Sequence, residues 1–208
     1  MVRCCKQFVS EVMHVTAAAL PSIVSRADLP ALGLSKRRLY AMVGAGELEQ
    51  IAPGYYMRPG ELDDTIATWA SISLRKPSAT ICLLSALSLH ELTDEIPRET
   101  DIALPRGERT LTTRFTPIRW HSFDRATFEL GRTEHRLPGA KLSIGLYSPE
   151  RTIIDTFRLR HEVGADVANE ALKRWLRRRG NAPATLLDLA GSFPKALPAL
   201  RATMEILL

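Results

Sequence analysis

Apolar residues recur every three or four positions along the first part of the chain, which predicts short amphipathic helices. The first is predicted over Phe8–Leu20 and is ended by the proline that follows it. A second is predicted over Ser25–Gly33, where Asp28 lies three residues after the serine and can accept a hydrogen bond from the cap amide. Pro30 is expected to distort this second helix, because it removes a backbone hydrogen bond.

A third helix is predicted over Lys36–Val43, with Ser35 as its N-cap. Its core-facing stripe consists of Leu39, Met42 and Val43. On the opposite face, Arg37 and the small residues Ala41 and Gly44 lie in the middle. Basic and aromatic side chains flank them: Lys36, Arg38 and Tyr40. Another molecule can therefore approach the backbone closely on this face.

A hairpin is predicted after the third helix. An apolar-containing strand leads to the turn pair Pro53-Gly54, and the residues after the turn, Tyr55–Met57, favour a strand. Three helices followed by a two-stranded wing predict a winged helix-turn-helix, and the glycine-containing turn Leu32–Leu34 is typical of that motif.

Pro59-Gly60 marks a predicted boundary, so we expect a winged helix over 1–60 and a second domain over 61–208. The second part mixes predicted helices with three strand candidates that look antiparallel and follow no alternating strand–helix rhythm, which predicts an α+β fold. Its expected helices are Asp63–Leu74, Leu83–Leu92, one beginning at Pro149, Asp166–Gly180, and two short ones through Leu186–Leu189 and Leu197–Leu208; the strand candidates begin at Asp101, Arg114 and Lys141.

The composition is that of an ordinary globular protein with a basic excess. The chain has 208 residues, 45% of them hydrophobic, a formal net charge of +5 and a pI of about 9.4. Residues 1–60 carry seven Lys or Arg and four Asp or Glu, so the excess is densest at the front. An anionic partner such as nucleic acid is consistent with this charge.

The three cysteines, Cys4, Cys5 and Cys82, show neither a metal-binding spacing nor a disulfide framework, which favours a reducing, cytoplasmic setting. The apolar segment Val12–Leu20 is too short to span a membrane. Polar residues interrupt it, which disfavours a signal peptide.

The basic first turn of the third helix is the strongest functional signal. Cations at a helix N-terminus oppose the helix dipole, so an external anion explains them better than helix stability does. In a helix-turn-helix this turn enters the DNA major groove. We expect Arg37 to read a guanine edge, with the remaining contacts going to phosphates or the backbone from Arg26, Ser35, Lys36, Arg38, Tyr40 and Arg58. The alternative is a winged helix that contacts only proteins and whose basic turn is solvated.

A second basic run lies near the end of the chain, where Arg174, Arg177 and Arg178 share the polar face of one predicted helix. A solvated face, docking of an acidic protein partner, and an auxiliary DNA contact all remain open for this run. Arg151 and Asp155, four residues apart, are expected to form a structural ion pair.

No catalytic or metal-binding pattern emerges. The five histidines follow no metal-ligand spacing, and no glycine-rich phosphate loop occurs, so neither a cofactor nor a metal is expected. Asp101 lacks the acid-x-Lys element of winged-helix nucleases. His121 and Asp124 could be imagined as an acid–base pair, but a histidine near a strand end is more often structural.

The order of several short motifs resembles the AbiEi-type antitoxins, the type IV abortive-infection toxin–antitoxin regulators. The motifs are Gly33-Leu34-Ser35, Gly46-Glu47-Leu48, Gly54-Tyr55-Tyr56, the segment Leu84–Leu92 and the segment Tyr147–Arg160. Pro30 and the long N-terminal lead depart from the family pattern.

The resemblance implies an antitoxin that represses its own operon by binding promoter DNA and that counteracts a co-encoded nucleotidyltransferase-like toxin, directly or indirectly. It extends the DNA-binding role to the wing, which includes Tyr55. It assigns the antitoxin activity to the C-terminal domain without naming residues. Two alternatives stay open: a plain regulator whose second domain binds a ligand or mediates oligomerisation, and a divergent nuclease.

Overall fold

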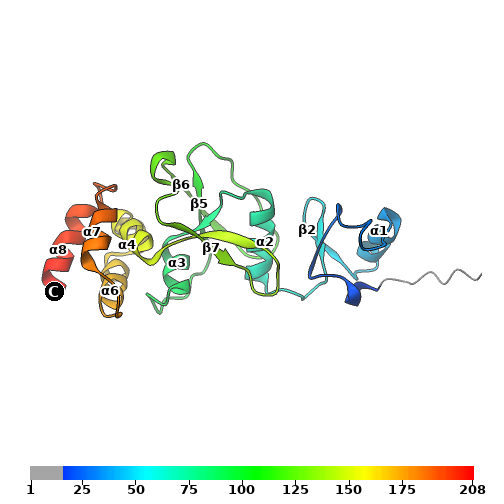
Figure 1. Cartoon of the computed structure of the whole chain (residues 1–208), viewed down its shortest axis with the longest axis horizontal. Coiled ribbons are helices and arrows are strands. Elements are labelled where there is room, and N and C mark those ends of the chain that lie inside the picture. The colour runs from blue at the N-terminus through cyan, green and yellow to red at the C-terminus, as the bar shows by residue number, and fades with distance from the viewer. Residues whose placement is uncertain (1–15) are drawn as a thin grey trace, which may run out of the picture. The chain divides into compact units, whose positions relative to one another are not determined.

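The computed structural model describes residues 16–208. The chain divides into two compact units, Met1–Glu61 and Leu62–Leu208, and each is described by itself (Figure 1). A small winged-helix unit precedes a larger unit of mixed helices and strands, so the predicted α+β class is confirmed. Most of the helix expected over Phe8–Leu20 lies outside the described residues.

The first unit is built around a three-stranded antiparallel sheet and one α-helix. The sheet has the order β1-β3-β2, with β1 at Ile23–Ser25, β2 at Glu49–Ala52 and β3 at Tyr55–Met57. Helix α1 spans Lys36–Gly44, close to its predicted bounds. One core joins the helix to the sheet, formed by Leu20, Val24, Leu29, Leu34, Leu39, Met42, Leu48 and Tyr56.

Two expectations for this unit need correction. The wing is not a two-stranded hairpin alone, because β1 pairs with β3 and adds a third strand. The segment expected as a second helix is a series of turns after Ser25, and Pro30 in its middle explains why no regular helix forms. The predicted cap contact is present all the same: the Ser25 amide donates to the Asp28 carboxylate at 3.3 Å. Ahead of β1 lies a short 3-10 helix, η1 (Ala17–Ala19).

The second unit has a mixed five-stranded sheet of order β6-β5-β4-β8-β7. The β4–β5 and β7–β8 pairs are antiparallel, whereas β5 runs parallel to β6 and β4 to β8, so the expectation of antiparallel-looking strands holds only in part. The strands are β4 (Thr80–Ile81), β5 (Thr100–Pro105), β6 (Ile118–Phe123), β7 (Arg132–Arg136) and β8 (Ser143–Tyr147).

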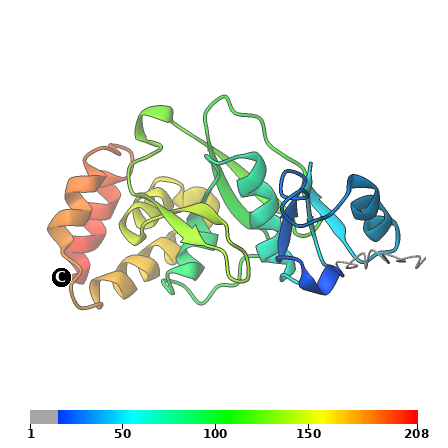
Figure 2. The same ribbon diagram turned by 45° about the vertical axis from the view of Figure 1, so that its right-hand side comes forward.

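Helices cover this sheet and continue beyond it as a helical group, in which α4, α6, α7 and α8 pack together (Figures 1 and 2). The unit contains α2 (Asp64–Arg75), α3 (Leu83–Leu89), the 3-10 helix η2 (Arg125–Thr127), α4 (Pro149–Arg158), α5 (Arg160–Val163), α6 (Ala165–Leu176), α7 (Pro183–Ala190) and α8 (Leu197–Leu207). Within the described part of the chain, no helix is both long and apolar enough to cross a membrane.

The two faces of the sheet have different neighbours, because successive residues of a strand point to opposite faces. Thr100 on β5 meets Trp69 of α2, whose indole nitrogen lies 3.4 Å from the threonine hydroxyl. The next residue, Asp101, points to the other face, where Arg158 of α4 stacks on Phe123 of β6. That second face contains most of the buried charge of the unit.

Candidate nucleic-acid interface

The first turn of α1 is fixed by its cap. Ser35 has extended backbone angles, and its hydroxyl accepts a hydrogen bond from the Arg38 amide at 3.1 Å. This contact satisfies one of the free amides that every helix N-terminus exposes. The remaining amides of the turn stay available to an anion.

The cations of this turn have no partner within residues 16–208. Lys36, Arg37 and Arg38 are exposed, and the turn contains no acidic residue. Within residues 16–208 none of the three side chains forms an ion pair or a hydrogen bond. They carry positive charge at the positive end of a helix dipole, an arrangement that a bound anion would relieve.

The outward face of α1 has the shape expected from the sequence. Leu39 and Met42 are fully buried, whereas Ala41 and Gly44 on the opposite side are exposed. Tyr40 lies beside them with about half of its surface exposed, 51%. Beyond Arg37, the centre of this face is therefore low and is bordered by taller polar side chains, which suits close approach to a groove.

Tyr40 contacts Tyr56 of the sheet, a residue that the sequence analysis did not assign to the DNA interface. The Tyr56 side chain of β3 interacts with that of Tyr40, and Arg26 is close enough to act on it electrostatically. Burial raises the pKa of Tyr56, the Tyr40 contact raises it further, and the Arg26 charge lowers it. Three segments far apart in sequence, the turn after β1, α1 and β3, thus converge at one point.

Two other predicted contacts lie in different surroundings. Tyr55 is half-buried at the turn of the wing, where its backbone pairs with Ser25. The Arg58 guanidinium donates to the carbonyls of Ala17 and Leu20 at 2.7 and 2.8 Å and pairs with Glu61 at 2.7 Å. Arg58 therefore has an internal structural role, and the phosphate contact expected of it stays a prediction.

The arginines near the end of α6 are also largely engaged within the protein. Arg174 pairs with Asp94 and with Glu170, and Arg178 donates to the carbonyls of His90 and Glu91 at 2.7 and 2.9 Å. These contacts attach α6 to the segment that follows α3. Arg177 is exposed and makes no ion pair within residues 16–208, and partner docking by this run stays a prediction.

The buried polar pairs of the second unit are partly those expected. Arg151 and Asp155 form the predicted ion pair at 2.8 Å, with both side chains fully buried. His121, however, does not pair with Asp124; its Nε2 lies 2.8 Å from Asp101 Oδ1 on the neighbouring strand. Only the parallel pairing of β5 with β6 brings His121 and Asp101 together, so the sequence alone could not show this contact. No cluster of three metal-ligating side chains occurs within residues 16–208.

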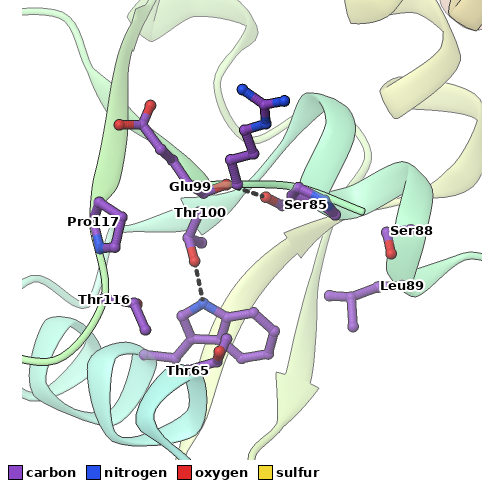
Figure 3. Close-up of a pocket in the computed structure, with 11 residues that line it drawn as sticks. Thr65, Ser85, Ser88, Leu89, Glu99, Thr100, Thr116 and Pro117 are labelled. Carbon is purple, nitrogen blue, oxygen red and sulfur yellow. Dashed lines mark hydrogen bonds between the residues drawn. The ribbon is translucent and has the colours of Figure 1, made fainter. Parts of the chain in front are cut away.

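A cavity of about 270 Å³ lies where α2, α3 and the start of β5 meet (Figure 3). Its interior is rich in hydroxyl groups, and several of them already have internal partners. Thr100 accepts from Trp69, and Ser85 accepts from the Asp101 amide at 2.8 Å. Thr116 bonds to Thr68 at 2.9 Å. The charged groups of the lining, Arg98 and Glu99, are exposed.

The fold consists of a winged helix followed by an α+β unit. Residues 16–59, which comprise the described winged helix, match the family of transcriptional regulators described as AbiEi antitoxins, so the predicted resemblance is confirmed over these residues. No curated protein matches the chain.

Among solved structures, the chain is similar to the RV2827C protein from Mycobacterium tuberculosis, with a TM-score of 0.50 and 18% identity. The match covers 90% of this chain and 78% of that protein. At this identity the likeness concerns the fold alone, and it extends over both units.

Proposed function

We propose that this protein is an antitoxin and autorepressor that binds the promoter of its own operon through the winged helix and counteracts a nucleotidyltransferase-like toxin. The match of residues 16–59 to transcriptional regulators of the AbiEi antitoxin type supports the general role. The DNA target, the toxin and the individual contacts are the finer parts of the proposal.

The observation that carries the proposal is the exposed, unpaired basic turn of α1. Three cations follow Ser35, which caps the helix. None of them has an acidic residue beside it within the described residues. Charge without an internal partner at a helix N-terminus contributes little to stability, whereas DNA phosphates supply the missing anions.

In the proposed complex, the first turn of α1 enters the major groove. Arg37, at the centre of the outward face, reads a guanine edge through its two-pronged guanidinium. Lys36 and Arg38 contact phosphates on either side, and Tyr40 contributes its hydroxyl. Arg26 and Tyr55 contact the DNA backbone from the turn of the wing. These contacts are inferred from exposure and charge.

The second unit is proposed to provide the antitoxin activity. The protein acts by binding in this account and needs no catalytic step, cofactor or metal. Whether the toxin is contacted directly is left to experiment. A regulator with a ligand-binding second unit is the alternative, and it predicts repression without any protection from a toxin.

A reporter gene under the upstream promoter tests repression, and co-expression with the neighbouring nucleotidyltransferase-like gene tests protection of growth. We expect the parent protein to do both. A variant with Lys36, Arg37 and Arg38 changed to Gln should lose repression, while its second unit is untouched. Repression by this variant at the parental level would refute the proposed interface.

A further inference from the structure

A second cavity of about 270 Å³ opens beside the edge strand β6, on the face of the sheet that faces α4. The cavity of Figure 3 is rich in hydroxyl groups. This second cavity is instead bordered by an imidazole and a guanidinium, each of which contacts a buried carboxylate. Its lining residues are Trp120, His121, Ser122, Phe123, Arg158, Leu159 and Glu162.

His121 is oriented by a buried carboxylate. Its Nε2 is 2.8 Å from Asp101 Oδ1, and the two side chains are only 8% and 9% exposed. Because a carboxylate accepts, Nε2 is the donor in this pair. Within the described residues Nδ1 has no hydrogen-bond partner, so it is the ring nitrogen left to meet a ligand.

Arg158 is held in a similar way. Its guanidinium lies over the Phe123 ring at 4.5 Å, and Nη2 is 2.9 Å from Asp155 Oδ1. Nη1 has no acceptor within residues 16–208, and one-fifth of the side chain is exposed. The guanidinium therefore presents a free donor on a side chain that cannot easily turn away.

These groups belong to a larger buried charged cluster. Behind Arg158 lies the fully buried pair of Arg151 and Asp155, with the Arg151 guanidinium 4.2 Å from the Tyr147 ring centre. Buried ion pairs are costly to desolvate, and apolar residues of the same volume are often as stable or more so. Oriented donors at a cavity wall are what a binding site needs.

We propose that this cavity binds a small phosphate monoester, with the phosphate on Arg158 and His121. A guanidinium forms strong charge-assisted hydrogen bonds to phosphate oxygens. The imidazole Nδ1 completes the phosphate contact by donating when the ring is protonated, or by accepting from a protonated phosphate oxygen when it is neutral. Nothing in this site depends on DNA binding by the winged helix.

The size and the rim of the cavity point to a hydroxylated ester whose phosphate and sugar lie inside it, a class that includes the nucleoside 5′-monophosphates. A volume of about 270 Å³ accommodates a phosphate and a sugar but not a stretch of duplex DNA. Glu162 at the rim repels a bare anion, yet it can accept hydrogen bonds from sugar hydroxyls. The same side chain therefore favours a sugar phosphate over inorganic phosphate.

The test is calorimetric titration of the full chain with three probes: inorganic phosphate, adenosine 5′-monophosphate and adenosine. We expect the nucleotide to bind most tightly, phosphate more weakly and adenosine not at all. Arg158→Gln and His121→Gln should each weaken nucleotide binding about tenfold or more, as expected for loss of a hydrogen bond to a charged group.

Matched variants separate this site from the rest of the basic surface. Arg160→Gln changes an exposed residue close in sequence and should leave binding unchanged. Lys36→Gln with Arg37→Gln removes two of the three cations of the α1 turn and should also leave binding unchanged. Glu162→Gln, at an exposed residue with little effect on folding, should tighten phosphate binding about twofold to fivefold by removing a repelling charge.

The outcomes decide the proposal in either direction. Saturable nucleotide binding that weakens in His121→Gln and Arg158→Gln supports it. If Arg158→Gln fails to fold, His121→Gln and Glu162→Gln carry the test. Absence of saturable binding at millimolar probe overturns the proposal. So does binding that is lost only with the winged-helix cations, or binding that Glu162→Gln and His121→Gln leave unchanged.

Discussion

The Ser35 hydroxyl lies 3.1 Å from the Arg38 amide nitrogen, so one hydrogen bond fixes both the start of α1 and the position of its basic turn. The same serine directly precedes three cations that have no ion-pair partner within the described residues. Helix stability and the proposed DNA contact therefore depend on one cap, and substitutions at this position can separate them.

Changing Ser35 to Ala should destabilise the protein by about 1 kcal/mol, because the cap acceptor is lost. Ser35→Asp should keep the cap and most of the stability, yet weaken DNA binding through its negative charge. Urea unfolding and fluorescence anisotropy with promoter DNA measure the two effects. Full DNA affinity in Ser35→Asp would show that this turn does not face phosphates.

Substitutions of Arg37 and of Lys36 should have different effects on DNA binding. Arg37→Ala should cost about 1–3 kcal/mol on the specific site and relax the preference at one base pair. Lys36→Ala should weaken binding to all sequences alike and reduce the salt dependence by about one phosphate contact. Competition binding with a set of single-base variants of the promoter at several salt concentrations separates them. Equal losses on specific and random DNA for both variants would remove Arg37 from base readout.

Arg58 is expected to stabilise the first unit through its internal hydrogen bonds. Its guanidinium joins the Ala17 and Leu20 carbonyls to the end of β3, so Arg58→Gln should lower the free energy of unfolding of the first unit. The slope of log affinity against log salt tests the phosphate contact predicted for Arg58. A slope reduced by about one contact would confirm that contact, whereas a parental slope would remove Arg58 from the DNA interface.

Acid should destabilise the second unit through His90. Burial lowers the pKa of this imidazole below its usual 6.5, although Nε2 donates to the Tyr147 carbonyl at 2.7 Å and that contact opposes the shift. The folded state then binds fewer protons than the unfolded state, so stability falls as the pH drops through 6.5 toward the folded pKa. His135, whose pKa is also lowered chiefly by burial, adds to the effect.

His90→Gln should therefore lose less stability than the parent between about pH 7 and about pH 5. Chemical denaturation at a series of pH values measures the slope. His161→Gln is the control, since that side chain is 71% exposed. A parental slope in His90→Gln would mean that other groups dominate the acid response.

The sequence predicted the elements whose periodicity is strong and local. Helix α1, with its cap at Ser35 and its buried Leu39 and Met42, follows directly from the pattern of apolar residues. Strand β8 was visible because its apolar residues alternate. The Arg151–Asp155 pair was predictable because its residues lie one helical turn apart.

The elements that escaped prediction are short, polar or non-local. Strand β1 has three residues and β4 has two, too few for a period to be recognised. Strand β7 reads Arg-Thr-Glu-His-Arg and lies at the edge of the sheet, where polar residues are tolerated. The His121–Asp101 and Tyr40–Tyr56 contacts join residues that only strand pairing and tertiary packing bring together.

The most direct test of the central claim is binding of the purified protein to its own upstream promoter, compared with a scrambled duplex of equal length at two salt concentrations. We expect selective binding that persists at the higher salt, because base contacts add to the phosphate contacts. Absent binding, or equal binding to both duplexes that disappears with salt, would contradict it. The basic turn of α1 would then be a solvated surface.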